Sequence, residues 1–198
     1  MKNKFKSILL LLLFILLAIL VINGYTKTID NIVYKFIISS KSNTITNLMK
    51  FISFLFSTKI VVLYCIFCLV FFKNKRNAIY LSGIMAIEAL LNNIIKVIIK
   101  RPRPEILQMV TVKTYSYPSG HTMAATIFLI VFGNFLKEKF KNNKRFITTI
   151  QVLLILLTGV SRIYLGVHYF TDIIGAILLS FAILIFIKDY VKIGDKLC

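Results

Sequence analysis

Apolar runs alternate with short polar segments along the chain, and this alternation is the strongest structural signal in the sequence. A helix that crosses the hydrocarbon core of a membrane needs about 20 largely apolar residues, and six runs approach or reach that length. They cover residues 8–22, 54–72, 78–99, 122–136, 146–163 and 169–187. We therefore predict an all-α integral membrane protein in which six transmembrane helices form a single domain over residues 1–198.

The first run resembles a signal peptide because a basic start precedes it, but residues 21–25 lack the small-residue pattern of a cleavage site. It is therefore predicted to remain as the first helix. The second run is predicted to begin before Lys59, because a start after that residue would leave too few residues to cross the membrane. The Lys59 side chain would then extend to the membrane surface.

Residues 23–53, between the first two runs, mix polar and apolar residues. The apolar residues recur at helical spacing with Lys27 and Lys35 among them, which is typical of a helix lying in the membrane interface. Such a helix could cover a site at the membrane surface. A plain connector is the alternative interpretation.

Composition and charge narrow the class of protein. A hydrophobic content of 58% and a mean hydropathy of +0.84 are too apolar for a soluble domain of 198 residues. The net charge of +18 comes from cations clustered between the apolar runs, which argues against nucleic acid as a partner. Cys65 and Cys68 lie inside an apolar run, where a thiol is a small packing residue rather than a redox group.

The distribution of lysine and arginine indicates which ends of the helices face the cytoplasm. With the N-terminus inside, 14 of the 25 cationic residues fall on the inner side, and cytoplasmic segments carry such an excess. These residues are Lys2, Lys4, Lys6, Lys73, Lys75, Arg76, Lys137, Lys139, Lys141, Lys144, Arg145, Lys188, Lys192 and Lys196. Both termini are therefore predicted to be cytoplasmic, which places the candidate site described next on the extracytoplasmic side.

Residues 159–172 contain an arginine, a histidine and an aspartate inside otherwise apolar sequence. If a helix begins after Gly166, His168 and Asp172 stand at positions i and i+4, and the carboxylate accepts a hydrogen bond from one ring nitrogen. The other ring nitrogen is then free to attack. Arg162 would end the preceding helix and hold its guanidinium beside this ring, a geometry suited to a phosphate.

A second polar feature lies on the predicted third helix, where Glu88, Asn92 and Lys96 recur every four residues and share one face. Two interpretations are open for Glu88 and Asn92, namely hydrogen bonding between helices and lining of a substrate cavity. In the six-helix topology, four helix ends lie on the same side of the membrane. They are the end of the third helix, the start of the fourth, the end of the fifth and the start of the sixth. Three segments therefore converge, at residues 96–104, 118–121 and 161–172.

The polar residues of these three segments match the spacing of a family signature. In order they are Lys96, six residues and Arg103-Pro104; Pro118-Ser-Gly-His121; and Ser161-Arg162, five residues, His168, three residues and Asp172. This pattern is similar to the full three-part signature of the type 2 phosphatidic acid phosphatase superfamily, over about residues 90–175. Among its members, the chain most resembles bacterial phosphatidylglycerophosphatase B-type lipid phosphatases.

The resemblance implies a role for each matching position. His168 would be the nucleophile that forms a phosphohistidine, Asp172 would fix its tautomer, and His121 would protonate the leaving group. The implied phosphate-binding residues are Lys96, Arg103, Ser119, Gly120 and Arg162. No cofactor or metal site is implied, and the seven acidic residues are mostly dispersed while the cations of the site would repel a divalent ion.

The function expected from the resemblance is metal-independent hydrolysis of a lipid phosphomonoester or diphosphate in the plasma membrane of a bacterium. Phosphatidylglycerophosphate is the first expected substrate, and undecaprenyl diphosphate is the enzymatic alternative. A carrier that binds a lipid or anion without chemistry would need the cations but not a nucleophile with its orienting acid. A vanadate-dependent oxidase is a third alternative, disfavoured because the chain has no soluble domain.

Overall fold

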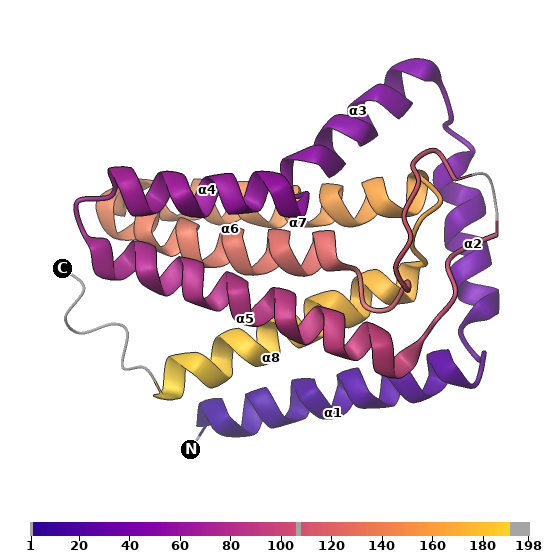
Figure 1. Cartoon of the computed structure of the whole chain (residues 1–198), viewed down its shortest axis with the longest axis horizontal. Coiled ribbons are helices and arrows are strands. Elements are labelled where there is room, and N and C mark those ends of the chain that lie inside the picture. The colour runs from indigo at the N-terminus through magenta and orange to yellow at the C-terminus, as the bar shows by residue number, and fades with distance from the viewer. Residues whose placement is uncertain (1, 106–107, 191–198) are drawn as a thin grey trace.

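The computed structural model describes residues 2–105 and 108–190, and this part of the chain is helical throughout apart from its connections (Figure 1). The helices are α1 (Lys2–Ile22), α2 (Lys27–Ile38), α3 (Asn43–Leu55), α4 (Thr58–Phe71), α5 (Lys75–Ile99), α6 (Gly120–Lys139), the short 3₁₀ helix η1 (Lys141–Asn143), α7 (Lys144–Tyr164) and α8 (Phe170–Tyr190). Lys192 and Lys196, which contribute to the predicted orientation, lie outside the described residues.

Five helices, α1, α5, α6, α7 and α8, are long and apolar enough to cross a membrane, and α3 with α4 makes a sixth candidate as one bent span. The prediction of an unbroken second helix over residues 54–72 is wrong. Helix α3 ends at Leu55, α4 begins at Thr58, and the two are inclined by 47°. Ser57 has extended backbone dihedrals and is the N-cap of α4, the position just before a helix at which serine is strongly preferred.

The segment 23–53 forms two helices rather than one. Figure 1 shows α2 standing across one end of the bundle, with α3 leading from it toward α4. One face of α2 is apolar and points outward, with Ile32 58% and Phe36 78% exposed, while Asp30 is buried at 1% exposure and Ile37 and Ile38 pack against the protein. An outward apolar face suits a helix that lies against lipid, and the buried acid ties the helix to the protein.

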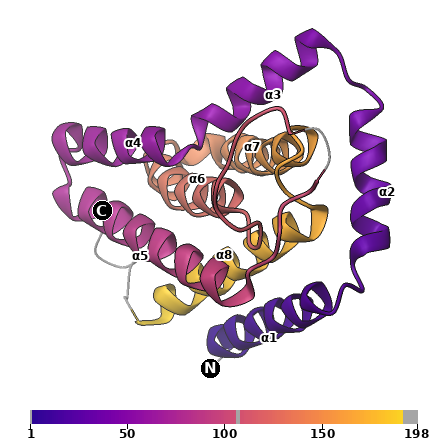
Figure 2. The same cartoon turned by 45° about the vertical axis from the view of Figure 1, so that its right-hand side comes forward.

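Helix α6 lies at the centre of the bundle and packs against α4, α5, α7 and α8 (Figure 2). Small residues such as Ala124, Ala125 and Gly133 let its neighbours approach closely, which is how membrane helices gain packing contacts in the absence of a hydrophobic driving force. Helix α1 lies along α8 and is joined to it where Ser7 Oγ donates to Ala182 O at 2.9 Å. The core is therefore built around α6.

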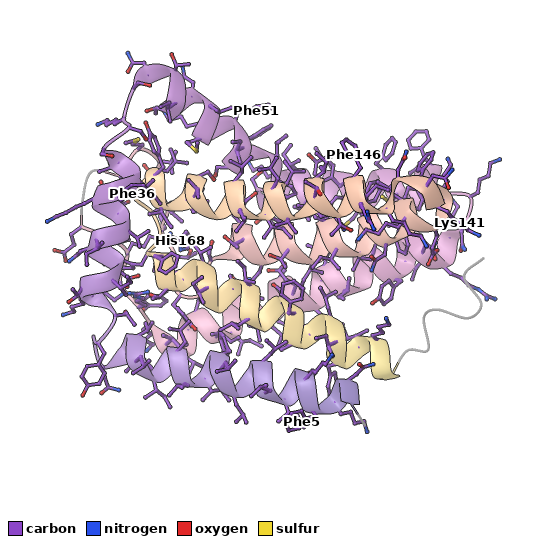
Figure 3. All side chains as sticks on the ribbon, turned by 180° about the vertical axis from the view of Figure 1, so that it is seen from behind. Phe5, Phe36, Phe51, Lys141, Phe146 and His168 are labelled. Carbon is purple, nitrogen blue, oxygen red and sulfur yellow. The ribbon has the colours of Figure 1, made fainter. Side chains whose placement is uncertain are left out.

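The outer surface of the bundle is strongly apolar. Phe5, Phe51 and Phe146 project away from the helices in Figure 3, and each is more than half exposed. Exposed apolar side chains of this kind are expected where hydrocarbon rather than water surrounds the protein. The chain is therefore a multi-pass membrane protein.

The ends of the helices sort into two groups, as the predicted topology requires. The end of α5, the start of α6, the end of α7 and the start of α8 lie at the same end of the bundle as α2 (Figure 1). The start of α1 and the end of α8 lie at the opposite end. The three polar segments predicted to converge are thus at one level.

Candidate active site

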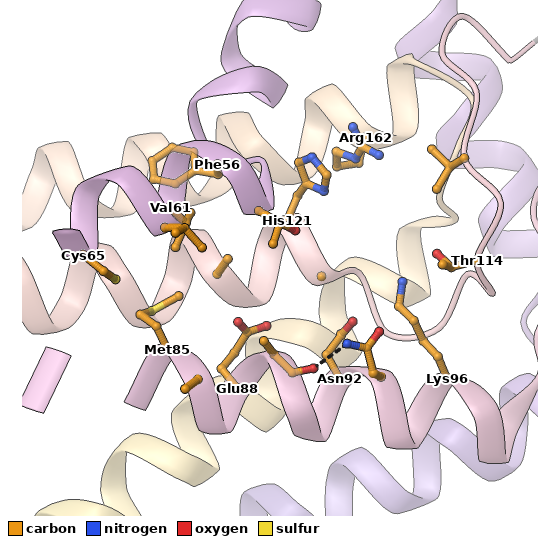
Figure 4. Close-up of a pocket in the computed structure, with 18 of the residues that line it drawn as sticks. Phe56, Val61, Cys65, Met85, Glu88, Asn92, Lys96, Thr114, His121 and Arg162 are labelled. Carbon is orange, nitrogen blue, oxygen red and sulfur yellow. Dashed lines mark hydrogen bonds between the residues drawn. The ribbon is translucent and has the colours of Figure 1, made fainter. Parts of the chain in front are cut away.

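A cavity of about 440 Å³ lies between α4, α5 and α6 and extends to the end of α7 and the turn that precedes α8. Its polar end is lined by both histidines of the chain, His121 and His168, and by three cations from different segments. The cations are Lys96 in the last turn of α5, Arg103 in the loop that follows, and Arg162 in the last turn of α7. Together with Gly120 at the start of α6, six of the eight residues predicted for the site therefore line one cavity. Figure 4 labels Lys96, His121 and Arg162 among them.

His168 lies in the turn between α7 and α8 rather than on a helix. The condition that a helix begins directly after Gly166 is not met, because Gly166 has a φ of 71°, which favours glycine and ends regular structure. Helix α8 starts at Phe170, close to the predicted start of the sixth run at residue 169. The predicted contact forms nevertheless. His168 Nδ1 lies 3.2 Å from Asp172 Oδ2, and the exposed fractions of the two residues are 2% and 0%.

The neighbours of the His168 ring define its tautomer. Arg103 Nη1 lies 3.2 Å from Nε2, and because a guanidinium can only donate, Nε2 must accept. Nδ1 then carries the proton and donates it to Asp172. Burial, followed by the charges of Arg103 and Arg162, holds the pKa of His168 well below its ordinary value of 6.5. The ring is therefore neutral near pH 7, with an unprotonated nitrogen at the cavity.

Asp172 is held by donors on both carboxylate oxygens. Oδ2 accepts from the backbone N–H of Tyr169 at 2.9 Å, from the Ser116 hydroxyl and from His168, and Oδ1 accepts from Arg101 Nη1 at 2.5 Å. So many donors around one fully buried carboxylate leave it a single orientation. The fixed carboxylate in turn orients the imidazole of His168.

The guanidinium of Arg103 is held in place by several hydrogen bonds. Nε donates to Thr114 O at 2.6 Å, Nη2 donates to Thr114 Oγ1 at 3.1 Å, and Nη1 donates to Val167 O at 2.6 Å. Burial, partly offset by Asp172, lowers the pKa of Arg103 to about 10. Arg103 thus connects the loop after α5 to the turn that carries His168, and it presents one nitrogen to the cavity.

The other two cations are buried at the cavity wall. Lys96 is 7% exposed, and Figure 4 shows its ammonium group directed into the cavity. Arg162 is 3% exposed and donates from Nη1 to the Ser53 hydroxyl on α3, while its Nε has no hydrogen-bond partner among the described residues. Buried donors without partners are energetically unfavourable, so an anion at this position would be stabilised.

The two predicted residues at the start of α6 are placed differently from each other. Gly120 lines the cavity, and a Cβ at this position would lie 3.0 Å from Asn92 Oδ1. Ser119 is fully buried, and its hydroxyl accepts from Thr122 Oγ1 at 3.0 Å. Among the described residues that line the cavity, Gly120 is present and Ser119 is not, so the structure does not bring the Ser119 side chain to the site.

Asn92 and Glu88 extend the polar stripe of α5 away from the cations. Asn92 Nδ2 donates to Pro118 O at 3.2 Å and to Met123 Sδ on α6 at 3.2 Å, so this residue both hydrogen-bonds between helices and lines the cavity. Glu88 is 4% exposed and lines the same cavity one turn further along. Beyond Glu88 the wall is mainly apolar, formed by Phe56, Val61, Val62, Cys65, Ile66, Leu69 and Met85.

Sequence reasoning missed a group of residues that surrounds Asp172. Arg101 bridges Asp172 and Asp30, and Ser116 donates to Asp172. One signal was present, since Asp30 is the only acidic residue before Glu88 in a strongly basic chain. In the described part of the chain, no three His, Cys, Asp or Glu side chains gather in a cluster that could hold a metal ion.

Comparison with known proteins tests the family expected from the signature. The family model of the PAP2 superfamily matches residues 77–193, which is more than half of the chain and contains all three polar segments. The chain belongs to the PAP2 superfamily. It is accordingly a PAP2-type membrane lipid phosphatase, a phosphohydrolase, and the expected family and enzyme class are confirmed.

Individual PAP2 proteins resemble the chain over nearly its full length. Phosphatidylglycerophosphatase B of Bacillus subtilis (strain 168) is 24% identical over 192 residues, which cover 94% of this chain and 95% of the relative. The crystal structure of a transmembrane PAP2-type phosphatidylglycerolphosphate phosphatase from Bacillus subtilis superposes with a TM-score of 0.86 at 23% identity, covering 98% of this chain and all of the other. The crystal structure of Aquifex aeolicus LpxE superposes with a TM-score of 0.64 at 24% identity, covering 78% of this chain and 92% of the other. These likenesses confirm the helical membrane fold.

Proposed function

We propose that this PAP2 protein hydrolyses a lipid phosphomonoester through a phosphohistidine on His168, and that phosphatidylglycerophosphate is its substrate. The observation that carries the proposal is the cavity itself, which joins two imidazoles and three cations at one end to an apolar wall at the other. A phosphate headgroup matches the first end and a hydrocarbon tail the second. The name of the Bacillus subtilis relative supports this choice of headgroup.

The first step transfers the phosphoryl group to the enzyme. Nε2 of His168 attacks phosphorus as the bond between phosphorus and the lipid oxygen breaks, and protonated His121 delivers its proton to the departing lipid alkoxide. Positive charge develops on the His168 ring, and the Asp172 carboxylate at Nδ1 stabilises it. Lys96, Arg103 and Arg162 bind the phosphoryl oxygens, and the N-terminus of α6 at Gly120 adds backbone donors.

The second step releases phosphate. Neutral His121 takes a proton from a water molecule as the water oxygen attacks phosphorus, and the bond between phosphorus and Nε2 breaks. Both histidines return to their starting states. No step needs a metal, because charge neutralisation, which a divalent ion supplies in other phosphatases, comes here from three buried cations that would repel such an ion.

Glu88 favours phosphatidylglycerophosphate over undecaprenyl diphosphate. It lies on the cavity wall between the cations and the apolar residues, where the inner part of a bound headgroup would lie. A glycerol headgroup carries a hydroxyl that can donate to this carboxyl group. The ionised diphosphate of undecaprenyl diphosphate carries no such hydroxyl.

The predicted orientation places this reaction at the extracytoplasmic surface of a bacterial plasma membrane. The polar residues of the cavity come from helix ends that lie opposite to the start of α1 (Figure 1), and the excess of lysine and arginine supports a cytoplasmic position for that start. The bacterial source of the relatives agrees with this location.

The test is phosphate release by the purified protein from phosphatidylglycerophosphate, phosphatidic acid and undecaprenyl diphosphate in detergent micelles, with excess EDTA throughout. We expect the highest kcat/KM for phosphatidylglycerophosphate and full activity in EDTA. His168→Ala should retain binding of orthophosphate and lose turnover. Abolition by EDTA with recovery in Mg²⁺ would refute the metal-free mechanism, and unchanged turnover in His168→Ala would refute the phosphohistidine.

A further inference from the structure

A second charged cluster lies behind the cavity and does not line it. The Arg101 guanidinium sits between two buried carboxylates, donating from Nη1 to Asp172 Oδ1 at 2.5 Å and from Nη2 to Asp30 Oδ2 at 2.6 Å. The side chain of Arg101 is 9% exposed and both aspartate side chains are 0% exposed. Residue 30 belongs to α2, outside the residues that the PAP2 family model matches.

The cluster is completed by polar groups of α2 and α8. Asp30 Oδ1 accepts from the Thr171 backbone N–H at 2.9 Å and from the Thr171 hydroxyl at 3.0 Å, and Thr26 Oγ1 accepts from Arg101 at 3.3 Å. The Tyr169 ring lies 4.0 Å from the guanidinium carbon. Burial alone would lower the pKa of Arg101, but Asp172 and Asp30 raise it, so this residue stays charged. Three charges are thus buried with nearly every donor and acceptor in use.

We propose that Arg101, held by Asp30, is a positioning residue that aims the Asp172 carboxylate at His168 and sets the negative charge which that carboxylate presents. The inference rests on the proposed function, because it assigns Arg101 a role through the nucleophile. An arginine paired with Asp172 alone would neutralise the negative charge of that carboxylate. Sharing the arginine with Asp30 leaves the three-residue cluster with one net negative charge, which favours the positive His168 ring formed during phosphoryl transfer.

The reasoning predicts opposite effects on the pH profile for two substitutions that both break the cluster. Arg101→Gln removes a positive charge near His168, which favours the protonated ring, so the profile of kcat/KM should move to higher pH by about one unit. Asp30→Asn removes a negative charge further away, so the profile should move to lower pH by about half a unit. The lipid phosphate titrates identically in every variant, and the differences therefore belong to the enzyme.

Several other charged or titratable groups face His168 and are unchanged in these variants. They are Lys96 on α5, Arg103 on the following loop, His121 on α6, Arg162 on α7 and Asp172 on α8. One substitution removes a positive charge and the other removes a negative charge. A response of these groups that is the same in both variants therefore cannot move the two pH profiles in opposite directions. The double variant Asp30→Asn with Arg101→Gln restores the net charge and should return the profile close to its original position at a reduced rate.

The experiment measures kcat, KM and the pH profile for phosphate release from micellar phosphatidylglycerophosphate. Arg101→Gln should lower kcat by about 10-fold to 100-fold with little change in KM, because the cations that contact the phosphate remain. Arg101→Lys keeps the charge with poorer geometry, so its profile should stay in place at an intermediate kcat. Lys35→Gln and Glu138→Gln, at exposed positions, are controls for loss of one charge and should behave as the unmodified protein.

The outcomes separate the two proposals. If the unmodified protein releases no phosphate from any lipid, the proposed function fails. If it is active and the Arg101→Gln and Asp30→Asn profiles coincide with its own, or both move in the same direction, the positioning role is overturned and the phosphatase stands. Should Arg101→Gln fail to fold in detergent, Arg101→Lys and Asp30→Asn still decide the question through their predicted profiles.

Discussion

Replacing Asp172 by asparagine separates the charge of this side chain from its shape, and the surroundings predict a large effect. Oδ2 accepts from three donors and Oδ1 from Arg101, so an amide fits in neither orientation. With its oxygen at the Oδ2 position, its NH₂ meets the guanidinium of Arg101. With NH₂ at that position, it meets the Tyr169 N–H and drives His168 to the tautomer with a protonated, unreactive Nε2.

The magnitude follows from the loss of a buried ion pair and of the charge that stabilises the phosphorylated ring. Breaking a buried pair by removing one partner costs about 3–5 kcal/mol. Converted at 1.36 kcal/mol for each factor of ten, a loss of this size in the transition state lowers kcat by about 10²-fold to 10⁴-fold. The same type of change lowers kcat by about 10⁴ in serine protease triads, where the aspartate also fixes a histidine tautomer.

Rapid-quench measurement of the phosphoenzyme with radiolabelled phosphatidylglycerophosphate tests this prediction. The Asp172→Asn protein should form phosphoenzyme slowly, with KM little changed, because the residues that contact the phosphate remain. Glu138→Gln, an exposed carboxyl at the other end of α6, is the matched control. An Asp172→Asn protein that retains kcat within about tenfold of the original would refute the orienting role of the carboxylate.

Four further predictions concern the rest of the cavity. His121→Ala should lower kcat/KM for the lipid by about 100-fold and kcat/KM for p-nitrophenyl phosphate far less, because kcat/KM reports the transfer to His168 and the p-nitrophenolate leaving group needs no proton; equal losses of kcat/KM for the two substrates would contradict the acid role. Cys65→Trp should block the apolar wall and reduce lipid turnover while sparing p-nitrophenyl phosphate, with Phe67→Trp on the exposed face as control. Glu88→Leu should lower kcat/KM for phosphatidylglycerophosphate and not for undecaprenyl diphosphate. Because the pKa of His168 is held well below 6.5, its protonation should not limit activity at pH 6, and a loss of kcat/KM centred at 6.5 with p-nitrophenyl phosphate in the His121→Ala protein would count against a buried neutral ring.

Helix positions were largely predictable because the membrane imposes a local rule. A span must be apolar over enough residues to cross the hydrocarbon, and the chain shows this in consecutive residues. The break between α3 and α4 escaped the rule, since apolar residues continue on both sides of Ser57. Whether such a run continues straight or bends depends on what it packs against, and α3 is held at its end by the contact between Ser53 and Arg162.

The candidate site was also partly predictable. The spacing of Arg162, His168 and Asp172, and the presence of both histidines in the three segments, depended only on topology and motif. The hydrogen-bond partners and burial of individual side chains depend on the tertiary structure as well. Arg103 was predicted to bind phosphate, and the sequence did not reveal that its guanidinium also donates to the backbone carbonyls of Thr114 and Val167. Ser119 was expected at the phosphate, and its side chain is buried against Thr122.

By itself, then, the sequence determined that the chain spans a membrane with helices, and it predicted which residues carry phosphate chemistry, because hydropathy and motif spacing are properties of neighbouring residues. Only the tertiary structure decided that Asp30 and Asp172 share one arginine and that the cavity continues into an apolar wall. These features join residues far apart in the chain, and the energy that selects them comes from burying charges and side chains together, which no local pattern records.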